Sequence, residues 1–515
     1  MTWCIRNFGR NVLFTPEHVR APQTEDDILA VLEEGRVVGI RAGGSLHGWS
    51  DGIATPGIFV DMRWFARVTV THQTVDGFRL ITVGGGCPLE FFLDVIRRQG
   101  YTLPTIGTIT RQTVAGAVST ATHGSGRSSL SHYVHRMRIA AYDDHGDPVI
   151  RDWTDEEALK MLRCGAGCTG LIVSVTFRCV PVFQVAERVR LHDSLSSVLS
   201  TDNDALDEFA VVPYLWKFVG YHRTVREPAV TGFRWMRAWP RRTLYRVYKL
   251  VAIDWAFHLL LCTILGLHRF GRWGGRSAER ITKSLFRKTK LLVGLGVVLT
   301  ARRGVVDESQ RALTRKHYLF RHVEMEVFVG ARDLEPVVEM LRTIVDVFAG
   351  TGAGIPEPVA NRLAPQSLDD VNLLQELERH AGSYVHHYPL YFRRVFADAT
   401  AISMTSDAGN EGCYAIGLFC YGAEKRRFYA LARFVATSMM RCFGARLHWG
   451  KYMPMFPEPA VGSVDLEQVY PHLPAFRDWC AANVDPNGVF HNDYSRRVLG
   501  FSKRKKMAGA ALIQV

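Results

Sequence analysis

The sequence lacks the patterns that mark common metal, nucleotide and secreted proteins. Its ten cysteines form no CxxC pair and no paired Cys/His spacing, which argues against a metal site or a disulfide framework and favours a reducing, cytoplasmic compartment. The closest pair, Cys164 and Cys168, is interpreted as two buried thiols. There is no P-loop, and neither of the glycine-rich segments 43–48 and 84–89 has the following helix and acidic residue of a GxGxxG dinucleotide site. No apolar segment near residue 1 predicts a secretory signal.

The composition is that of a folded protein. Of the 515 residues, 47% are hydrophobic and 22% are charged, and the mean hydropathy is −0.01, which excludes disordered, collagen-like and polytopic membrane classes. Single hydrophobic cores stop growing at about 250–300 residues. The length therefore predicts two lobes.

Acidic residues are scarce in one region. Residues 223–303 contain 18 Lys/Arg against three acids, although the whole chain carries only +13. Trp, Phe and Leu are interspersed with these arginines, a mixture that favours an anionic membrane surface over nucleic acid, and no zinc-finger, homeodomain or RNP pattern is present. The apolar run 251–267 would reach only about 26 Å as a helix, too short to span comfortably. We expect peripheral or monotopic membrane contact, or alternatively an amphipathic helical pair buried in the second lobe.

The first third of the chain alternates between predicted helices and predicted strands. Apolar periodicity predicts a helix over 24–34 that ends at Gly35, then strands at 37–41, 58–61 and 80–83 and a helix over 89–99. Small residues dominate 103–126, which cannot fill a core alone. Either a large flat molecule packs on this backbone, or the segment is a glycine-rich surface loop.

Several segments in this order resemble one family. They are GSLHGWSD at 44–51, the small-residue stretch 103–126, GAGCTGLI at 165–172, GARLHWGK at 444–451 and DPNGVFHNDY at 485–494. Together they resemble the aldonolactone oxidoreductases, which include L-gulonolactone, L-galactonolactone and D-arabinonolactone oxidases, among the vanillyl-alcohol-oxidase-type flavoproteins. The resemblance covers about 5–182 and 315–500, with the basic region as an insertion.

The resemblance implies an α+β fold with two lobes. Residues 1–185 would form the FAD-binding domain, and 186–440 an α/β substrate (cap) domain that carries the insertion 223–303. Residues 441–500 would complete the active site, and 501–515 would form a tail.

The resemblance also implies FAD as the cofactor, attached covalently through His47 if this chain follows the family. Two further roles stay open from the residues alone: His123 lies either by the flavin or serves to shape its loop, and His448 either relays a proton or packs. The implied cofactor-binding residues are Gly43, Gly44, Ser45, Leu46, His47, Gly48, Gly107, Thr108, Thr113, Gly116, Ala117, Ser119, Thr120, His123, Gly124, Gly170, Ile172 and Lys451.

For catalysis, the resemblance implies Lys451 and Arg393, with His448 as the candidate relay. The sequence departs from the family at Tyr391, which stands where the family has glutamate. Glu326 lies in the segment 323–329, in which apolar and polar residues alternate. It either supplies a carboxylate in place of the family's glutamate or faces solvent.

The implied activity is oxidation of an alcohol carbon of an aldono-1,4-lactone or related polyol, by hydride transfer to flavin N5. The electron acceptor would be oxygen, a cytochrome or a quinone. The Tyr391 departure and the amphiphilic insertion permit an alternative, a same-fold enzyme acting on a lipid-linked sugar or hydrophobic alcohol at the membrane. A non-catalytic flavin-binding interaction protein is a third reading. No nucleic-acid partner is expected.

Overall fold

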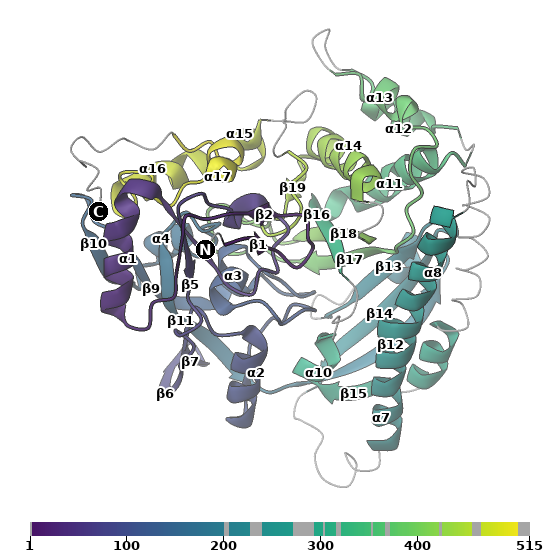
Figure 1. The fold of residues 1–515 in the computed structure, drawn as a ribbon. Coiled ribbons are helices and arrows are strands. Elements are labelled where there is room, and N and C mark those ends of the chain that lie inside the picture. The colour runs from purple at the N-terminus through teal and green to yellow at the C-terminus, as the bar shows by residue number, and fades with distance from the viewer. Residues whose placement is uncertain are drawn as a thin grey trace.

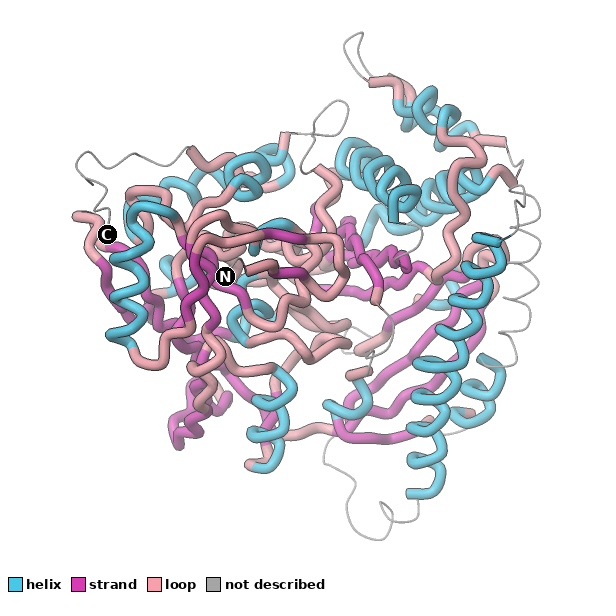
Figure 2. The backbone as a smooth tube through the Cα atoms, viewed as in Figure 1, coloured by secondary structure: helices cyan, strands magenta, loops and turns pink. Residues whose placement is uncertain are grey.

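The computed structural model describes most of the chain. The described residues are 3–199, 205–226, 239–270, 293–301, 304–315, 321–351, 354–365, 371–421, 425–455 and 465–502. Two lobes lie side by side, with loops between them (Figure 1, Figure 2).

The first lobe contains two main sheets and a two-stranded sheet of β1 (Ile5–Arg6) and β2 (Leu13–Phe14). A small parallel sheet has the strand order β3-β5-β4, and a larger antiparallel sheet has the order β10-β9-β11-β7-β6, with β8 paired to β11. Helices pack around both sheets and bury the apolar faces that their spacing predicts. The bounds are β3 His18–Arg20, α1 Glu25–Val38, β4 Ile40–Gly43, β5 Ile58–Asp61, β6 Val68–Val75, β7 Phe78–Gly84, α2 Leu89–Arg98, β8 Tyr101–Thr102, α3 Val114–Ser119, β9 Val134–Tyr142, β10 Pro148–Trp153, α4 Glu156–Leu162 and β11 Leu171–Pro181.

The first predicted helix is longer than expected. The predicted end at Gly35 is wrong, because α1 continues to Val38 and the strand predicted at 37–41 occupies Ile40–Gly43. Gly35 is a packing residue: a Cβ there would lie 2.1 Å from Ile40 Cδ1. The helix ends instead at Gly39, whose φ of 86° favours glycine. The strands at 58–61 and 80–83 and the helix at 89–99 are confirmed, each within two residues.

The second lobe is an eight-stranded antiparallel sheet in the order β15-β12-β14-β13-β17-β18-β16-β19. Side chains alternate between its faces, so one face is apolar and packs on α11 and α14, while the other is charged and aromatic. The bounds are β12 Gln184–His192, β13 Glu208–Val212, β14 Lys217–Arg226, β15 Val305–Glu308, β16 His322–Gly330, α11 Leu334–Ala349, β17 Leu390–Val395, β18 Cys413–Tyr421, α14 Lys425–Phe443 and β19 Arg446–Leu447.

The basic insertion forms helices that lie across β12 and β14 (Figure 1). They are α7 (Trp239–Tyr248), the π-helical η3 (Lys249–Ala256) and α8 (Phe257–Phe270), and residues 293–300 are also helical. Tyr245 and Tyr248 are buried against the sheet, so part of the insertion is a packed amphipathic element of this lobe. No helix among the described residues is long and apolar enough to cross a membrane. Residues 227–238 and 271–292 of the predicted insertion lie outside the described residues.

The C-terminal part returns to the first lobe. Ile40 N donates to Val489 O at 3.0 Å, and Arg41 Nη1 donates to Phe490 O at 2.8 Å. Residues 444–451 lie between the lobes, whereas 465–502 pack on the first lobe. The helices of this part are α15 Leu466–Val469, α16 Leu473–Asn483 and α17 Asp493–Val498, and the predicted tail from 503 onward is not among the described residues.

Candidate functional site

A long cleft opens in the first lobe against the 448–451 segment, with about 1810 Å³ of empty space. Its walls are the loops at 41–53, 85–88, 112–120 and 166–172, which are the glycine-rich and small-residue segments of the sequence. Most of the predicted cofactor residues line it: Gly43, Gly44, Ser45, Leu46, His47, Gly48, Thr113, Gly116, Ser119, Thr120, Gly170, Ile172 and Lys451.

The cleft suits a large flat group such as FAD. Its floor is made by backbones that approach too closely for side chains: a Cβ on Gly44 would lie 2.1 Å from Thr113 Oγ1, and one on Gly86 would lie 1.8 Å from Met62 O. Because these residues have a small side chain or none, the cleft stays open for a ligand and the loops behind it can pack closely.

The remaining predicted cofactor residues lie elsewhere. Gly107, Thr108 and His123 line a second cavity described below. Ala117 is fully buried in the core of the first lobe, and Gly124 N donates to Thr105 Oγ1 at 3.1 Å. Neither of these two residues lines the cleft. The segment 103–126 therefore contributes residues to the cleft, to the second cavity and to the core.

His47 lies in the cleft wall on a constrained loop. Its ring stacks on Phe8 with centroids 4.7 Å apart, and Phe8 N donates to Leu46 O at 2.8 Å. Leu46 has φ of 55°, a backbone region that favours glycine. Burial, reinforced by Arg111 and Lys451, lowers the pKa of His47 to about 4. The imidazole is therefore neutral at pH 7 and keeps a nucleophilic lone pair.

The second cavity lies between the lobes, and its empty space, including the part open to solvent, is about 840 Å³. It shares Gln112, His448 and Lys451 with the cleft, so the two spaces meet there. Both charged side chains and aromatic rings line the second cavity. The lining is Gly107, Thr108, Ile109, Gln112, Thr122, His123, Glu208, His258, Arg315, His322, Glu324, Glu326, Tyr388, Tyr391, Arg393, Phe419, Tyr421, His448 and Lys451.

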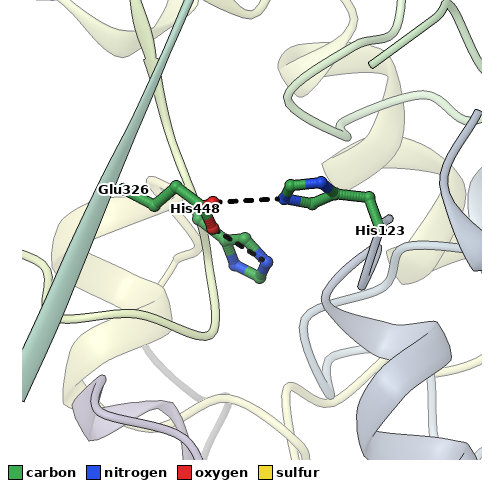
Figure 3. Close-up of side chains that lie close together, drawn as sticks. All are labelled: His123, Glu326 and His448. Atoms are coloured by element: carbon green, nitrogen blue, oxygen red, sulfur yellow. Dashed lines mark ion pairs between the residues drawn. The ribbon is translucent and has the colours of Figure 1, made fainter. Parts of the chain in front are cut away.

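Glu326 is the centre of the charged group. It is only 3% exposed, so of the two open readings of this residue the buried carboxylate is the one observed. Its Oε1 lies 3.4 Å from His123 Nε2 and 3.7 Å from Arg393 Nη1, and its Oε2 lies 4.0 Å from His448 Nε2 and 3.9 Å from Lys451 Nζ. Figure 3 shows both imidazole rings beside this carboxylate, each joined to it by a dashed line, and the two ring centroids lie 5.9 Å apart.

Hydrogen bonds to these histidines locate their protons. His123 Nδ1 lies 2.9 Å from the Gly124 carbonyl oxygen, to which it donates, while its Nε2 faces Glu326. His448 Nδ1 accepts from Gly450 N at 3.0 Å, so the proton of the neutral ring is on Nε2. Burial lowers the pKa of His448 to about 3, which keeps the ring neutral.

The same three side chains place their ligand atoms within 4.8 Å of one another, a spacing that a metal ion could use. Such an ion would need the His448 Nε2 lone pair, which is protonated in this hydrogen-bond arrangement. Lys451 and Arg393 also lie within 4 Å of Glu326 and would repel a cation. The cluster of His123, Glu326 and His448 is therefore better suited to holding protons.

Glu324 and Glu326 lie on the same face of β16 but differ in acidity. Burial raises the pKa of Glu324, even though Lys451 Nζ lies 2.5 Å from its Oε2. Burial acts on Glu326 in the same direction, but the charges of His123 and Lys451 outweigh it and hold its pKa well below the ordinary value. Two adjacent carboxylates with opposite shifts are typical of separate acid–base roles.

The Tyr391 departure is explained by the sheet register. Tyr391 on β17 and Glu326 on β16 both pair with Gly417 on the intervening β18. They therefore share one cross-strand row, and a carboxylate is present in that row two strands away from Tyr391. Arg393 is held on the other side by Glu208, whose Oε2 lies 3.5 Å from its Nε.

Several lining residues had not been predicted as site residues from the sequence: Gln112, Glu208, His258, Arg315, His322, Glu324, Tyr388, Phe419 and Tyr421. For Glu324 a signal existed, since the segment 323–329 alternates and places positions 324 and 326 on one face. The others come from several separate segments, and His258 comes from the insertion, so no local pattern could have joined them.

Comparison with known proteins agrees with this geometry. The FAD binding domain family matches residues 16–144, and the D-arabinono-1,4-lactone oxidase family matches residues 175–498. A long-chain alcohol oxidase from an uncultured marine euryarchaeote is 34% identical over 96% of both chains. An L-gulono-1,4-lactone dehydrogenase from Mycobacterium tuberculosis is 24% identical over 96% of this chain and 98% of that protein.

Among solved structures, a cholesterol oxidase from B. sterolicum superposes with a TM-score of 0.70 over 97% of both chains at 14% identity, which shows the shared two-lobed α+β flavoprotein fold. The resemblance inferred from the motifs is confirmed, and so are FAD as the cofactor and the oxidoreductase class. The chain therefore belongs to the D-arabinono-1,4-lactone oxidase family and is an FAD-dependent oxidoreductase of the aldonolactone and alcohol oxidase type.

Proposed function

We propose that this protein oxidises a hydrophobic alcohol, with the hydroxyl at the Glu324/Glu326 cluster and the apolar body along an aromatic wall. The observation that supports this proposal most is that wall, which Tyr388, Tyr391 and Phe419 form in the lining of the second cavity. The ring centroid of Phe419 lies 5.0 Å from that of Tyr388 and 5.7 Å from that of Tyr391, which is the spacing of packed aromatic rings. A small sugar ring would leave these faces unused. The relative named as a long-chain alcohol oxidase supports this choice.

The charged residues would divide the work of the reaction. FAD, when bound, supplies the acceptor for the hydride that leaves the alcohol carbon. Glu324 takes the hydroxyl proton onto a carboxylate oxygen, because burial makes it the more basic of the two carboxylates. Lys451 and Arg393 stabilise negative charge that develops on the substrate oxygen, and Glu326 stays ionised to hold these two cations. His448 donates a hydrogen bond from Nε2.

The test is a substrate comparison with the flavin-loaded protein under anaerobic conditions. Flavin absorbance should bleach with 1-alkanols and respond weakly to aldono-1,4-lactones and alditols. Bleaching by lactones with no response to alkanols would overturn the proposal.

A second candidate is the lactone itself. It is favoured by the retained Lys451, Arg393 and His448 and by the family match over 175–498. On this reading Tyr391 would be a hydrogen-bond partner of the lactone, so Tyr391→Phe should impair lactone turnover. On the hydrophobic-alcohol reading Tyr391→Phe should be nearly neutral, because only the ring face is used.

We further propose that His47 joins the flavin covalently. The neutral, loop-held imidazole in the cleft wall supports this role. His47→Ala protein should lose the yellow colour that survives acid precipitation, whereas His72→Ala, an exposed histidine on β6, should keep it. Flavin that acid extracts freely from the wild type would contradict the proposal.

Peripheral membrane contact is proposed for the insertion. Leu244, Val247, Val251, Trp255 and Leu259 are each about half exposed and follow one another at three- or four-residue spacing, as on one side of a helix. The sequence 223–303 around this stripe is rich in Lys and Arg, a composition that favours an anionic lipid surface.

The membrane prediction concerns sedimentation with phosphatidylglycerol vesicles. The double change Val251→Glu with Trp255→Glu should lower vesicle affinity at least about tenfold, since each lost apolar side chain contributes about 1.5–3 kcal/mol when fully buried. Trp64→Glu, an exposed tryptophan in the first lobe, is the control and should bind as the wild type does. Equal binding by all three proteins would refute membrane contact through this stripe.

A further inference from the structure

A third, smaller cavity lies directly behind the aromatic wall. In this structure it is small, with only about 10 Å³ free for a water-sized group, and it shares Tyr388, Phe419 and Tyr421 with the second cavity. One layer of side chains therefore separates the two spaces. Its remaining lining is Leu261, Tyr384, His387 and Cys420, a largely apolar set with aromatic rings.

The cavities are arranged along the strand direction. From the row of Glu326 and Gly417, the paired strands pass through Glu324 and Phe419 to Tyr421, which pairs with His322. At about 3.3 Å per residue, Tyr421 lies about 7 Å along the strand from the row of Glu324 and about 13 Å from the row of Glu326. A linear molecule whose hydroxyl lies at the cluster would thus point its far end at the partition.

The partition is closed by a contact from the insertion. His258, 3% exposed on α8, has its Nδ1 in hydrogen-bond contact with the Tyr421 hydroxyl. Its ring lies 5.9 Å from that of Tyr388, and Tyr388 lies 5.9 Å from Tyr421. Burial lowers the pKa of His258 to about 4, so the ring is neutral at pH 7 and the contact carries no net charge. Opening this buried hydrogen bond against an apolar chain costs about 5- to 150-fold in affinity, which corresponds to about 1–3 kcal/mol. About two to four buried methylenes, at about fourfold each, would offset that cost.

We propose that the third cavity receives the distal end of the substrate's alkyl chain, and that the His258–Tyr421 contact is a latch that sets the accepted chain length. This inference rests on the proposed hydrophobic-alcohol function and adds the residues that would determine its specificity. Short alcohols end before the partition and leave the latch closed. Longer ones displace it and bury their last methylenes against Leu261 and Phe419.

The experiment compares 1-alkanols of increasing length with four variants of the full-length, flavin-loaded protein. His258→Ala and Tyr421→Phe open the latch, the second without losing the ring. Leu261→Phe and Leu261→Trp fill the third cavity to two different extents, so that one informative variant remains if the larger does not fold. Tyr429→Ala removes a ring that stacks on Tyr452 and lines none of the three cavities, and it serves as the control.

We would measure kcat/KM for each chain length. We would also measure the dissociation constant by calorimetry with the reduced, anaerobic enzyme, which cannot turn over. Each methylene buried in the third cavity should improve both about fourfold. The open-latch variants should favour longer alcohols than the wild type does. The filled variants should lose the gain beyond the partition and handle the shortest alcohols as the wild type does.

Two results would count against the inference, and they are distinct. If every variant shifts all chain lengths by the same factor, or if filling the cavity changes nothing, the latch is overturned while alcohol oxidation stands. If the wild type neither binds nor oxidises any alkanol, the proposed function itself fails.

Discussion

Glu324→Gln protein should have a kcat/KM for its alcohol about 10²–10⁴-fold below that of the wild type, the usual contribution of a positioned general base. Glutamine keeps the shape of the side chain and can still contact Lys451, but it cannot take a proton. Steady-state kinetics with the best alkanol measures the effect. Glu335→Gln, an exposed position on α11, is the matched control and should behave as the wild type does.

The pH profile of the same variant gives an independent reading. A base works only when ionised, and burial raises the pKa of Glu324 above the ordinary glutamate value of about 4.3. The kcat/KM of the wild type should therefore rise with pH through an acidic limb that lies above that value. In Glu324→Gln the limb should be absent. An unchanged limb, or activity close to that of the wild type, would assign the proton to another group.

Glu326→Leu should cost about 3–5 kcal/mol of unfolding free energy, as expected when one partner of a buried charge network is removed. The carboxylate is buried within 4.0 Å of two histidines, an arginine and a lysine, and without it Arg393 and Lys451 keep their charges with fewer counterions. Urea unfolding of the flavin-loaded protein measures the loss. Glu326→Gln should lose less, because it retains the volume and can accept hydrogen bonds.

The direction in which the stabilising contribution of Glu326 changes with pH also follows from the structure. The pKa of Glu326 is lower in the folded than in the unfolded protein, so folding favours its ionised form. Its contribution is therefore complete above the unfolded value of about 4.3 and declines as the pH falls below it. The stability difference between wild type and Glu326→Leu should be constant from pH 7 to 5 and shrink in more acidic solution. A difference that grows on acidification would show that the carboxylate is not held ionised.

Local sequence patterns were sufficient for the cofactor half of the site. The glycine-rich and small-residue segments at 43–48 and 103–126 carry their information in adjacent residues, because a backbone that must lie flat against a ligand excludes side chains over a contiguous stretch. Most residues predicted from these segments line the cleft. The misplaced helix end at Gly35 has a related cause: glycine was interpreted as a terminator, but close packing on Ile40 required it.

The substrate half depends on contacts between distant segments. His123, Glu326, Arg393 and His448 come from four elements, and only the register of β16, β17 and β18 brings the carboxylate into the row of Tyr391. The insertion shows the same limit, since its composition predicted an amphiphilic surface but not that His258 would reach the inner cavity. Sequence alone thus determined the family, the cofactor and the loops that hold it. Tertiary structure decided which carboxylates are buried, which cations oppose them and what closes the pocket, because alternation along one strand specifies two faces but not what each face meets.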